Sequence, residues 1–244
     1  MLDFDGVLCD STPECVVTAW NTWQDHFAHC PNEVPVVYRT AVEEGRNYVK
    51  TAGEYLILLE SACDSIPIVS QEDYDSAFQK HRCQIAAFAE RFFIARDRLR
   101  REDENHWIAL HEIYEGIPES LRQGVSNMDC YIVTGKDACS VKLFLQKMDV
   151  GIPDARIYDK DAAHDKLSAI RTISENSNVP LSSIALLDDN VNHLLPALDA
   201  GCYAAMAGWG YHSEEHLKLA KTRGIPVLGL SNWINAFMEW KLQG

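Results

Sequence analysis

Residues 1–11 read MLDFDGVLCDS, a short apolar segment interrupted by two carboxylates and a glycine. Side chains two residues apart on a strand lie on the same face, so Asp3 and Asp5 would share one face among apolar neighbours that require burial. The conflict disappears if a strand ends at Asp3 and the chain then opens into a loop. In open α/β sheets, ligands bind at this carboxyl end of the strands.

The second half of the chain alternates short apolar segments with helical periodicity. Strands are predicted at residues 131–133, 156–158, 184–187 and 202–207 and from Pro226 onward. Helices are predicted between them, ending at about Lys147 and spanning residues 166–174 and 193–200, with a last helix before Trp240. Strands that alternate with helices pair in parallel through right-handed crossovers. The sequence therefore predicts a doubly wound, Rossmann-like α/β core.

A helical block interrupts this core after its first strand. Apolar residues recur at helical spacing over residues 16–27, 42–59 and 74–94, and Ser70 with Asp73 forms a capping signal before the last of these. We therefore expect an α/β core made of residues 1–12 and 111–244. Residues 13–110 are expected to form an inserted all-α domain.

The composition and the net charge limit which binding partners and which location are expected. The 244 residues include 22 Lys and Arg against 36 Asp and Glu, which gives a formal charge of -14. Such a field repels nucleic-acid phosphates and anionic lipid, so neither nucleic acid nor a membrane is expected as a partner. The eight cysteines form no CxxC pair, and no apolar run of about 18 residues occurs. Reduced thiols and a cytoplasmic location are the corresponding expectations.

Polar groups follow three of the predicted strands. They are Asp3 and Asp5 after the first, Thr134 and Gly135 after the second, and Asp188 and Asp189 after a later one, with Lys166 opening a helix between them. Parallel strands bring these ends together, and carboxylates crowded at one edge repel one another unless a cation binds them. Oxygen ligands favour Mg2+ over softer metals, so the sequence predicts a magnesium site beside a position for a phosphoryl group.

The order of these motifs resembles the haloacid dehalogenase (HAD) superfamily of phosphohydrolases. The resemblance rests on Asp3-x-Asp5-Gly6-Val7, the apolar strand ending at Thr134, Lys166, and the apolar strand ending at Asp188-Asp189. It extends along the chain through Glu115-Gly116-Ile117-Pro118, Ala200-Gly201 and Trp209-Gly210. The helical insertion resembles the first type of α-helical cap domain in this superfamily.

The resemblance implies a role for each motif residue. Asp3 would be the nucleophile that forms an aspartyl-phosphate, and Asp5 the general acid and base. Thr134, Gly135 and Lys166 would bind the phosphoryl oxygens. Asp3, the Asp5 carbonyl and Asp189 would hold Mg2+, with Asp188 standing where many members have glycine.

Some assignments stay open on the residues alone. Many phosphatases of the superfamily have a second Asp at the position of His193. Because this Asp is absent here, the resemblance implies that Asp188 or Asn190 supports the metal instead. Lys136 and Lys160 compete with Lys166 for the phosphoryl-binding role, and Lys166 fits better because it begins a helix. A run of arginines is expected on a solvated helix face, paired with acidic neighbours: Arg91, Arg96, Arg98, Arg100 and Arg101.

Asp5 favours hydrolysis of a small phosphorylated metabolite, because an alkoxide leaving group needs a proton. Arg46 and Lys50, one helical turn apart in the insertion, are the expected contacts to the rest of the substrate. Two alternatives remain: a phosphosugar mutase, which has a similar cap and both aspartates, and a catalytically silent binding module. Silent relatives typically lose one of the motif carboxylates, all of which are present here. The oligomeric state is left open.

Overall fold

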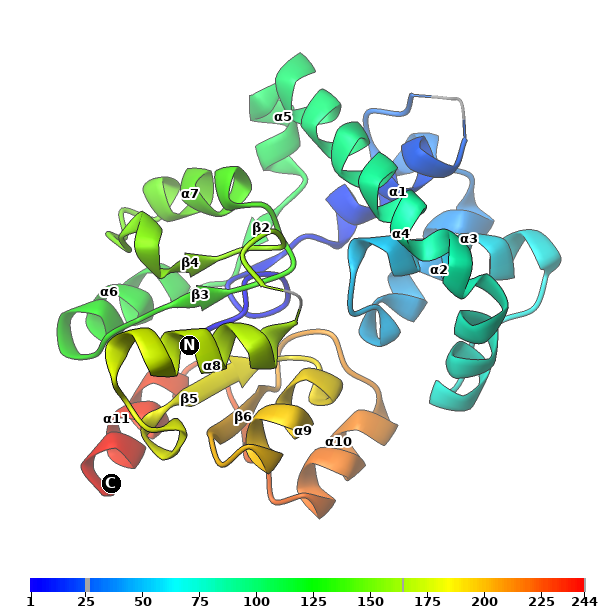
Figure 1. The fold of residues 1–244 in the computed structure, drawn as a ribbon. Coiled ribbons are helices and arrows are strands. Elements are labelled where there is room, and N and C mark those ends of the chain that lie inside the picture. Colours follow the sequence, from blue (N-terminus) through cyan, green and yellow to red (C-terminus); the bar gives the residue numbers. More distant parts are fainter. Residues whose placement is uncertain (25–26, 164, 244) are drawn as a thin grey trace. The chain divides into compact units, whose positions relative to one another are not determined.

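A computed structural model describes residues 1–24, 27–163 and 165–243 (Figure 1). The chain divides into two compact units, one formed by Met1–Cys9 with Ile113–Gly244 and the other by Asp10–Glu112. We call them the core unit and the helical unit. In the described part of the chain, no helix is long and apolar enough to cross a membrane.

The core unit contains a parallel sheet built from short strands. Strands β3 (Ile132–Val133) and β4 (Ile157–Tyr158) form one parallel pair. Strands β5 (Ala185–Asp188), β6 (Tyr203–Ala207) and β7 (Val227–Leu228) form a parallel group of three. The predicted strands of the second half are thus present, and all of the pairs are parallel as expected.

Leu2 joins the two groups of strands. It makes isolated parallel bridges to Ile132 of β3 and to Leu187 of β5, so the first segment lies in the middle of the sheet. The Leu2 amide donates to the Tyr131 carbonyl at 2.9 Å, and the Asp3 amide donates to the Leu187 carbonyl at 3.0 Å. The expected first strand is therefore reduced to one bridging residue, and the chain leaves the sheet after Asp3.

A tight turn follows Asp3 and aims the next residues away from the sheet. The Leu8 amide donates to the Phe4 carbonyl and the Gly6 amide to the Cys9 carbonyl, both at 2.8 Å. Gly6 has a φ of 79°, a backbone conformation that favours glycine. The chain then forms β1 (Cys9–Asp10), which pairs with β2 (Glu112–Ile113) where the two connections between the units run.

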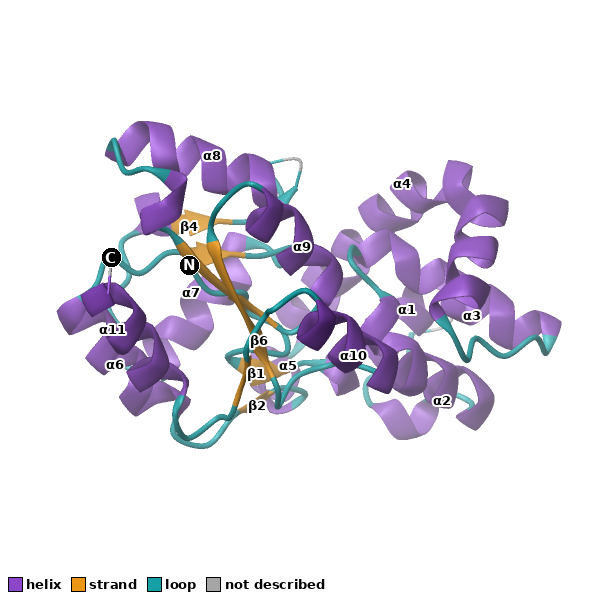
Figure 2. Ribbon diagram, turned by 90° about the horizontal axis from the view of Figure 1, so that it is seen from below, coloured by secondary structure: helices purple, strands orange, loops and turns teal. Residues whose placement is uncertain are grey.

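Helices cover both sides of the sheet (Figure 2). Those of the core unit are α6 (Ile117–Asn127), α7 (Ala138–Lys147), α8 (Lys166–Ser177), α9 (Val191–Asp199), α10 (Glu214–Thr222) and α11 (Trp233–Gln243). Short 3-10 turns precede β4 and β5, at Asp154–Arg156 and Leu181–Ser183. Leu186, Ala204 and Met206 of the sheet share a buried cluster with residues of α8, α9 and α10.

Side-chain caps begin the helices that follow the strands. Asp137 accepts the Ser140 amide at 2.9 Å before α7, Asp165 accepts the Ser168 amide at 2.7 Å before α8, and Asn190 accepts the Asn192 amide at 3.0 Å before α9. Each cap satisfies an amide that has no partner within its helix. Two of these caps fall beside Lys136 and Lys166, and the third lies directly after Asp189.

The helical unit contains α1 (Thr12–Trp23), α2 (Val36–Gly45), α3 (Tyr55–Asp64), α4 (Gln71–Glu102) and α5 (Glu104–Ala109), with 3-10 turns at Pro31–Glu33, Arg46–Tyr48 and Ala52–Glu54. The Asp73 amide donates to Ser70 Oγ at 3.2 Å, as the capping signal predicted. The first predicted helix, at residues 16–27, reaches past Trp23, and its positions 25 and 26 lie outside the described residues.

The single helix predicted over residues 42–59 is wrong. Helix α2 ends at Gly45 and α3 begins at Tyr55, with two 3-10 turns between them. Gly53 lies against the Ile85 backbone, where a Cβ on residue 53 would be 2.2 Å from the Ile85 carbonyl oxygen. Apolar residues on both sides of this break share one buried cluster, so their spacing resembles that of one helix although the backbone turns.

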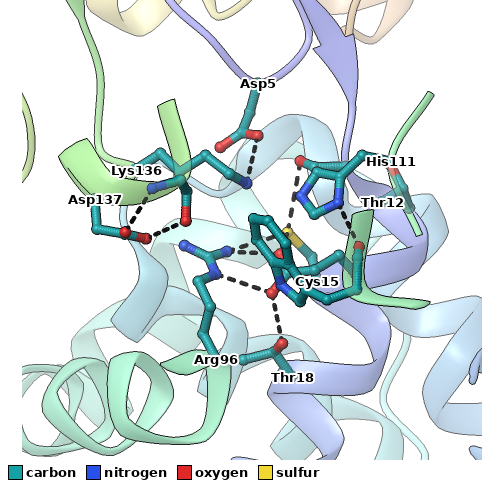
Figure 3. A network of polar contacts seen from close by, with 12 residues as sticks. Asp5, Thr12, Cys15, Thr18, Arg96, His111, Lys136 and Asp137 are labelled. Atoms are coloured by element: carbon teal, nitrogen blue, oxygen red, sulfur yellow. Dashed lines mark hydrogen bonds and ion pairs between the residues drawn. The ribbon is translucent and has the colours of Figure 1, made fainter. Parts of the chain in front are cut away.

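One arginine of the run between Arg91 and Arg101 is buried, contrary to the expectation of a solvated face. Arg96 Nε and Nη2 donate to the two carboxylate oxygens of Glu14 at 2.9 and 2.8 Å, which joins α4 to α1. Thr18 Oγ1 donates to Glu14 Oε1 at 2.6 Å. Figure 3 shows Arg96 with Thr18 and Cys15 close by. Arg98, by contrast, pairs with Glu102 in solvent as expected.

We expect Arg96→Ala to destabilise the protein by about 3–5 kcal/mol, because Glu14 is then buried without its counter-charge. Urea denaturation measures the free energy of unfolding. The control is Lys80→Ala, which lies on the same helix as Arg96 and breaks an exposed pair with Asp64 of α3; it should cost much less. Equal losses in the two variants would contradict the stabilising role of the buried pair.

Candidate active site

Asp3, Lys166 and Asp188 meet at the carboxyl edge of the sheet. Asp3 follows the bridging residue Leu2, Asp188 ends β5, and Lys166 begins α8. Lys166 Nζ lies 2.7 Å from Asp3 Oδ2 and also forms an ion pair with Asp188 Oδ2. The second oxygen of Asp3, Oδ1, accepts the Phe4 amide at 2.7 Å. Both oxygens of the Asp3 carboxylate are therefore held in place.

His193 extends this group from the first turn of α9. Its Nδ1 lies 3.2 Å from Asp188 Oδ1, which also accepts the Asn190 amide at 2.9 Å. Among the described residues, Asp3, Asp188 and His193 form a group whose potential ligand atoms all lie within 4.8 Å of one another. Asp188 thus lies between Lys166 and His193, and its expected support of a metal, like that of Asn190, remains a prediction.

Burial and charge act on the ionisable groups in opposite directions. Burial raises the pKa of Asp3, although the nearby Lys166 works against this. Burial opposes ionisation of Asp188 as well, but Lys166 and His193 hold the pKa of its carboxyl well below its usual range. For Lys166, burial is outweighed by Asp188 and Asp3, which raise the pKa of the ammonium group. The ammonium therefore stays charged between two carboxyl groups of unequal acidity.

Asp5 belongs to a second ion pair. Lys136 Nζ lies 3.0 Å from Asp5 Oδ1, with the Lys136 side chain fully buried and the Asp5 side chain 14% exposed (Figure 3). Lys136 entered the sequence reasoning only as a rival for the phosphoryl-binding lysine, and its pairing with Asp5 was missed. The available signal was its place two residues after Thr134, on the turn that follows β3.

Thr134 and Gly135 lie at the same edge, directly after β3. Thr134 is buried, and its amide donates to the Tyr158 carbonyl at 2.9 Å. Its hydroxyl oxygen accepts the Lys136 amide at 3.2 Å, and Gly135 is exposed. Leu2 pairs with Ile132 in parallel, so these two neighbouring segments end at the same edge of the sheet. Thr134 and Asp3 therefore both lie where the chain leaves this edge.

Asp189 is turned away from Asp188, as consecutive residues at a strand end are. Its Oδ2 accepts the Tyr211 amide at 2.7 Å. It also lies against the loop after Asp5, because a Cβ on Gly6 would be 2.1 Å from this oxygen. The resemblance gave Asp189 the main place in the metal site, whereas the side chain grouped with Asp3 is that of Asp188.

The remaining predicted residues lie apart from these pairs. Lys160 Nζ contacts the largely exposed Asp161 at 2.6 Å, so it does not compete with Lys166. Arg46 and Lys50 lie in the helical unit, at and just after the 3-10 turn Arg46–Tyr48. Arg46 lies over the Tyr55 ring, with its guanidinium carbon 5.7 Å from the ring centre, and Lys50 is exposed. Their contact with a substrate remains a prediction.

The architecture is similar to that of solved HAD-like proteins. A predicted phosphoglycolate phosphatase from Haemophilus somnus has a TM-score of 0.62 at 14% identity, with 96% of this chain and 95% of that chain covered. A predicted phosphatase from Clostridium acetobutylicum has a TM-score of 0.59 at 17% identity, covering 98% and 96%. A haloacid dehalogenase-like family protein from Streptococcus pneumoniae has a TM-score of 0.52 at 16% identity, covering 94% and 91%.

These likenesses extend over nearly the whole length of each chain and show the fold. The protein has the HAD-like fold, a Rossmann-like α/β core interrupted by an all-α insertion, and the fold class predicted from the sequence is confirmed. No protein-family model matches the sequence, and no curated protein matches it.

We expect Lys166→Met to destabilise the protein by about 3–5 kcal/mol at neutral pH, because two buried carboxylates then face each other without the ammonium between them. Each carboxyl would then have a raised pKa in the folded state, so protonation would relieve the repulsion. The loss of stability relative to the parent should therefore shrink as the pH falls.

Urea denaturation at neutral pH and at about pH 4.5 tests this expectation, since that range covers the start of carboxyl protonation. Lys160→Met is the matched control, because its partner Asp161 is largely exposed. A loss of stability that is the same at both pH values would contradict the account of the Lys166 charge.

Proposed function

We propose that the protein is a Mg2+-dependent phosphohydrolase that cleaves a small phosphate monoester through an aspartyl-phosphate intermediate. The observation that carries the proposal is the buried Asp3 carboxylate, held by Lys166 at the carboxyl edge of the sheet with Asp5 two residues further on. A nucleophilic carboxylate, a cation for the phosphoryl group and a second carboxyl for proton transfer are the groups that this reaction needs.

The charges at the sheet edge fit a divalent cation. Asp3, Asp5, Asp188 and Asp189 bring four carboxyl groups to this edge, whereas Lys136 and Lys166 supply two ammonium groups. This excess of acidic groups favours a cation, and carboxylate and carbonyl oxygens are the ligands that Mg2+ prefers. Asp3, the Asp5 carbonyl, Asp188 and Asp189 are the residues that would hold it. When bound, the ion would neutralise charge on the phosphoryl oxygens.

In the first step, an oxygen of Asp3 forms a bond to phosphorus while the bond from phosphorus to the ester oxygen breaks. The electron pair of that bond passes to the leaving oxygen, which takes a proton from Asp5. In the second step, water attacks phosphorus, Asp5 accepts the water proton, and the Asp3 carboxylate is released with inorganic phosphate. Thr134, Gly135 and Lys166 bind the phosphoryl oxygens throughout.

Two further observations support hydrolysis of a small phosphate ester. Among the structures of similar fold, those from Haemophilus somnus and Clostridium acetobutylicum are described as a predicted phosphoglycolate phosphatase and a predicted phosphatase. The chain also retains Asp3 and Asp5 together, which a silent binding module would not require. We place Arg46 and Lys50 of the helical insertion as contacts to the part of the substrate beyond its phosphate.

Hydrolysis of para-nitrophenyl phosphate tests the reaction, and a panel of phosphorylated metabolites then tests the substrate. Asp3→Asn should lower turnover by several orders of magnitude, because an amide is a far weaker nucleophile. Asp161→Asn, a change of the same type at an exposed position, should leave turnover unchanged. Thermal denaturation confirms that both variants fold. Substantial phosphatase activity in folded Asp3→Asn would exclude Asp3 as the nucleophile.

The metal requirement gives a separate expectation. Chelation should abolish activity, Mg2+ should restore it, and Ca2+ should restore it poorly, because its larger and looser coordination shell misplaces the attacking carboxylate. Mg2+ should also raise the melting temperature of the parent, since a ligand that binds only the folded state stabilises it. Asp188→Asn should weaken that thermal shift. Full activity in excess chelator would rule out the metal assignment.

A further inference from the structure

Lys136 is a buried cation that the proposed reaction does not use. Its side chain is fully buried, and its ammonium group lies 3.0 Å from Asp5 Oδ1 (Figure 3). The same ammonium lies 5.6 Å from the centre of the Phe4 ring, which is itself fully buried. A buried ammonium is unfavourable unless it is paired, so its position beside Asp5 calls for an explanation.

The backbone around Lys136 is fixed as well. The Lys136 amide donates to Thr134 Oγ1 at 3.2 Å, and the Lys160 amide donates to the Lys136 carbonyl at 3.4 Å. The next residue, Asp137, caps α7. The lysine is therefore anchored at its backbone by the turn and along its stem by packing. Its ammonium group can accordingly act as a fixed point for a neighbouring side chain.

Asp5 is the neighbouring side chain that this fixed ammonium group would orient. It follows the tight turn that carries the chain out of the sheet, and its side chain is partly exposed. A general acid and base must keep its carboxyl within hydrogen-bond reach of the proton that moves. An ammonium on Oδ1 restricts rotation of the carboxylate and gives its other oxygen a defined direction.

We propose that Lys136 is a positioning residue for proton transfer by Asp5. The inference rests on the proposed phosphohydrolase function and assigns separate roles to the two buried lysines. Lys166 serves the nucleophile and the phosphoryl group, whereas Lys136 acts on the substrate only through Asp5. The two lysines thus hold the two catalytic carboxyl groups separately, Lys166 from the first turn of α8 and Lys136 from the turn that precedes α7.

The proposal predicts a particular kinetic pattern for Lys136→Met. Turnover of an alkyl phosphate should fall by about 10- to 100-fold, the scale of loss caused by a misplaced catalytic group. Turnover of an aryl phosphate should fall less, because a phenolate leaves with less help from a proton. KM should change by less than about threefold, since the lysine does not touch the substrate. Lys136→Arg should recover part of the alkyl phosphatase activity.

A double-mutant cycle with Asp5→Asn tests whether Lys136 acts through Asp5. If it does, Lys136→Met should cause no further loss on the alkyl ester once Asp5 is already Asn, so the two effects will not add. A structural role would lower the activity of both backgrounds by the same factor. Lys160→Met, which removes the partner of Asp161 at the neighbouring loop, is the control and should match the parent.

Thermal denaturation shows which variants fold. If Lys136→Met does not fold, the cycle is run with Lys136→Gln, which removes the charge but keeps a hydrogen-bond donor. The loss on the alkyl ester should then be smaller, and it should still be absent once Asp5 is already Asn. The Arg variant gives a comparison that retains the charge in either case.

The outcomes separate this inference from the function on which it rests. A parent that hydrolyses no phosphate ester would overturn both. An active parent with additive losses in the cycle, equal losses on alkyl and aryl esters, or a rise in KM alone would overturn the positioning role of Lys136 and leave the phosphohydrolase in place.

Discussion

The pairing of Leu2 with two strands is the interaction on which the site depends. One residue joins β3 on one side and β5 on the other, and without it the parallel pair and the parallel group of three would not be connected through this segment. The same pairing puts Asp3 at the point where the chain leaves the sheet. Lys166 and Asp188 reach Asp3 because α8 begins and β5 ends at that edge.

The carboxylates at this edge repel one another, and two lysines partly compensate their charge. Lys166 lies between Asp3 and Asp188, and Lys136 compensates Asp5 from the turn after β3. Asp3 and Asp188 respond differently to burial and to the shared cation, so their pKa values move in opposite directions. The charge that remains is what a divalent ion would balance, which links the local structure to the proposed chemistry.

The sequence predicted the fold and the main members of the site because their signals are local. Three of the predicted core strands are short apolar segments followed by polar groups, and Lys166 opens a helix after a capping Asp165. The break at Gly45 was missed because packing determines it, through apolar residues that would also fit one continuous helix. The orientations of Asp188 and Asp189 depend on how β5 ends. The ion pairs Glu14–Arg96 and Asp5–Lys136 join residues far apart in the sequence. The periodicity of a sequence carries no information about ion pairs between distant residues.

The central claim is that Asp3 attacks phosphorus, and trapping the covalent intermediate tests it most directly. The protein is mixed with an aryl phosphate, quenched in acid during turnover, digested, and analysed by mass spectrometry for a phosphoryl group on the N-terminal peptide. The account predicts a phosphoryl adduct on Asp3 that appears within the first turnover and disappears when the substrate is exhausted. Turnover with no adduct on Asp3, or with the phosphoryl group on another residue, would contradict it.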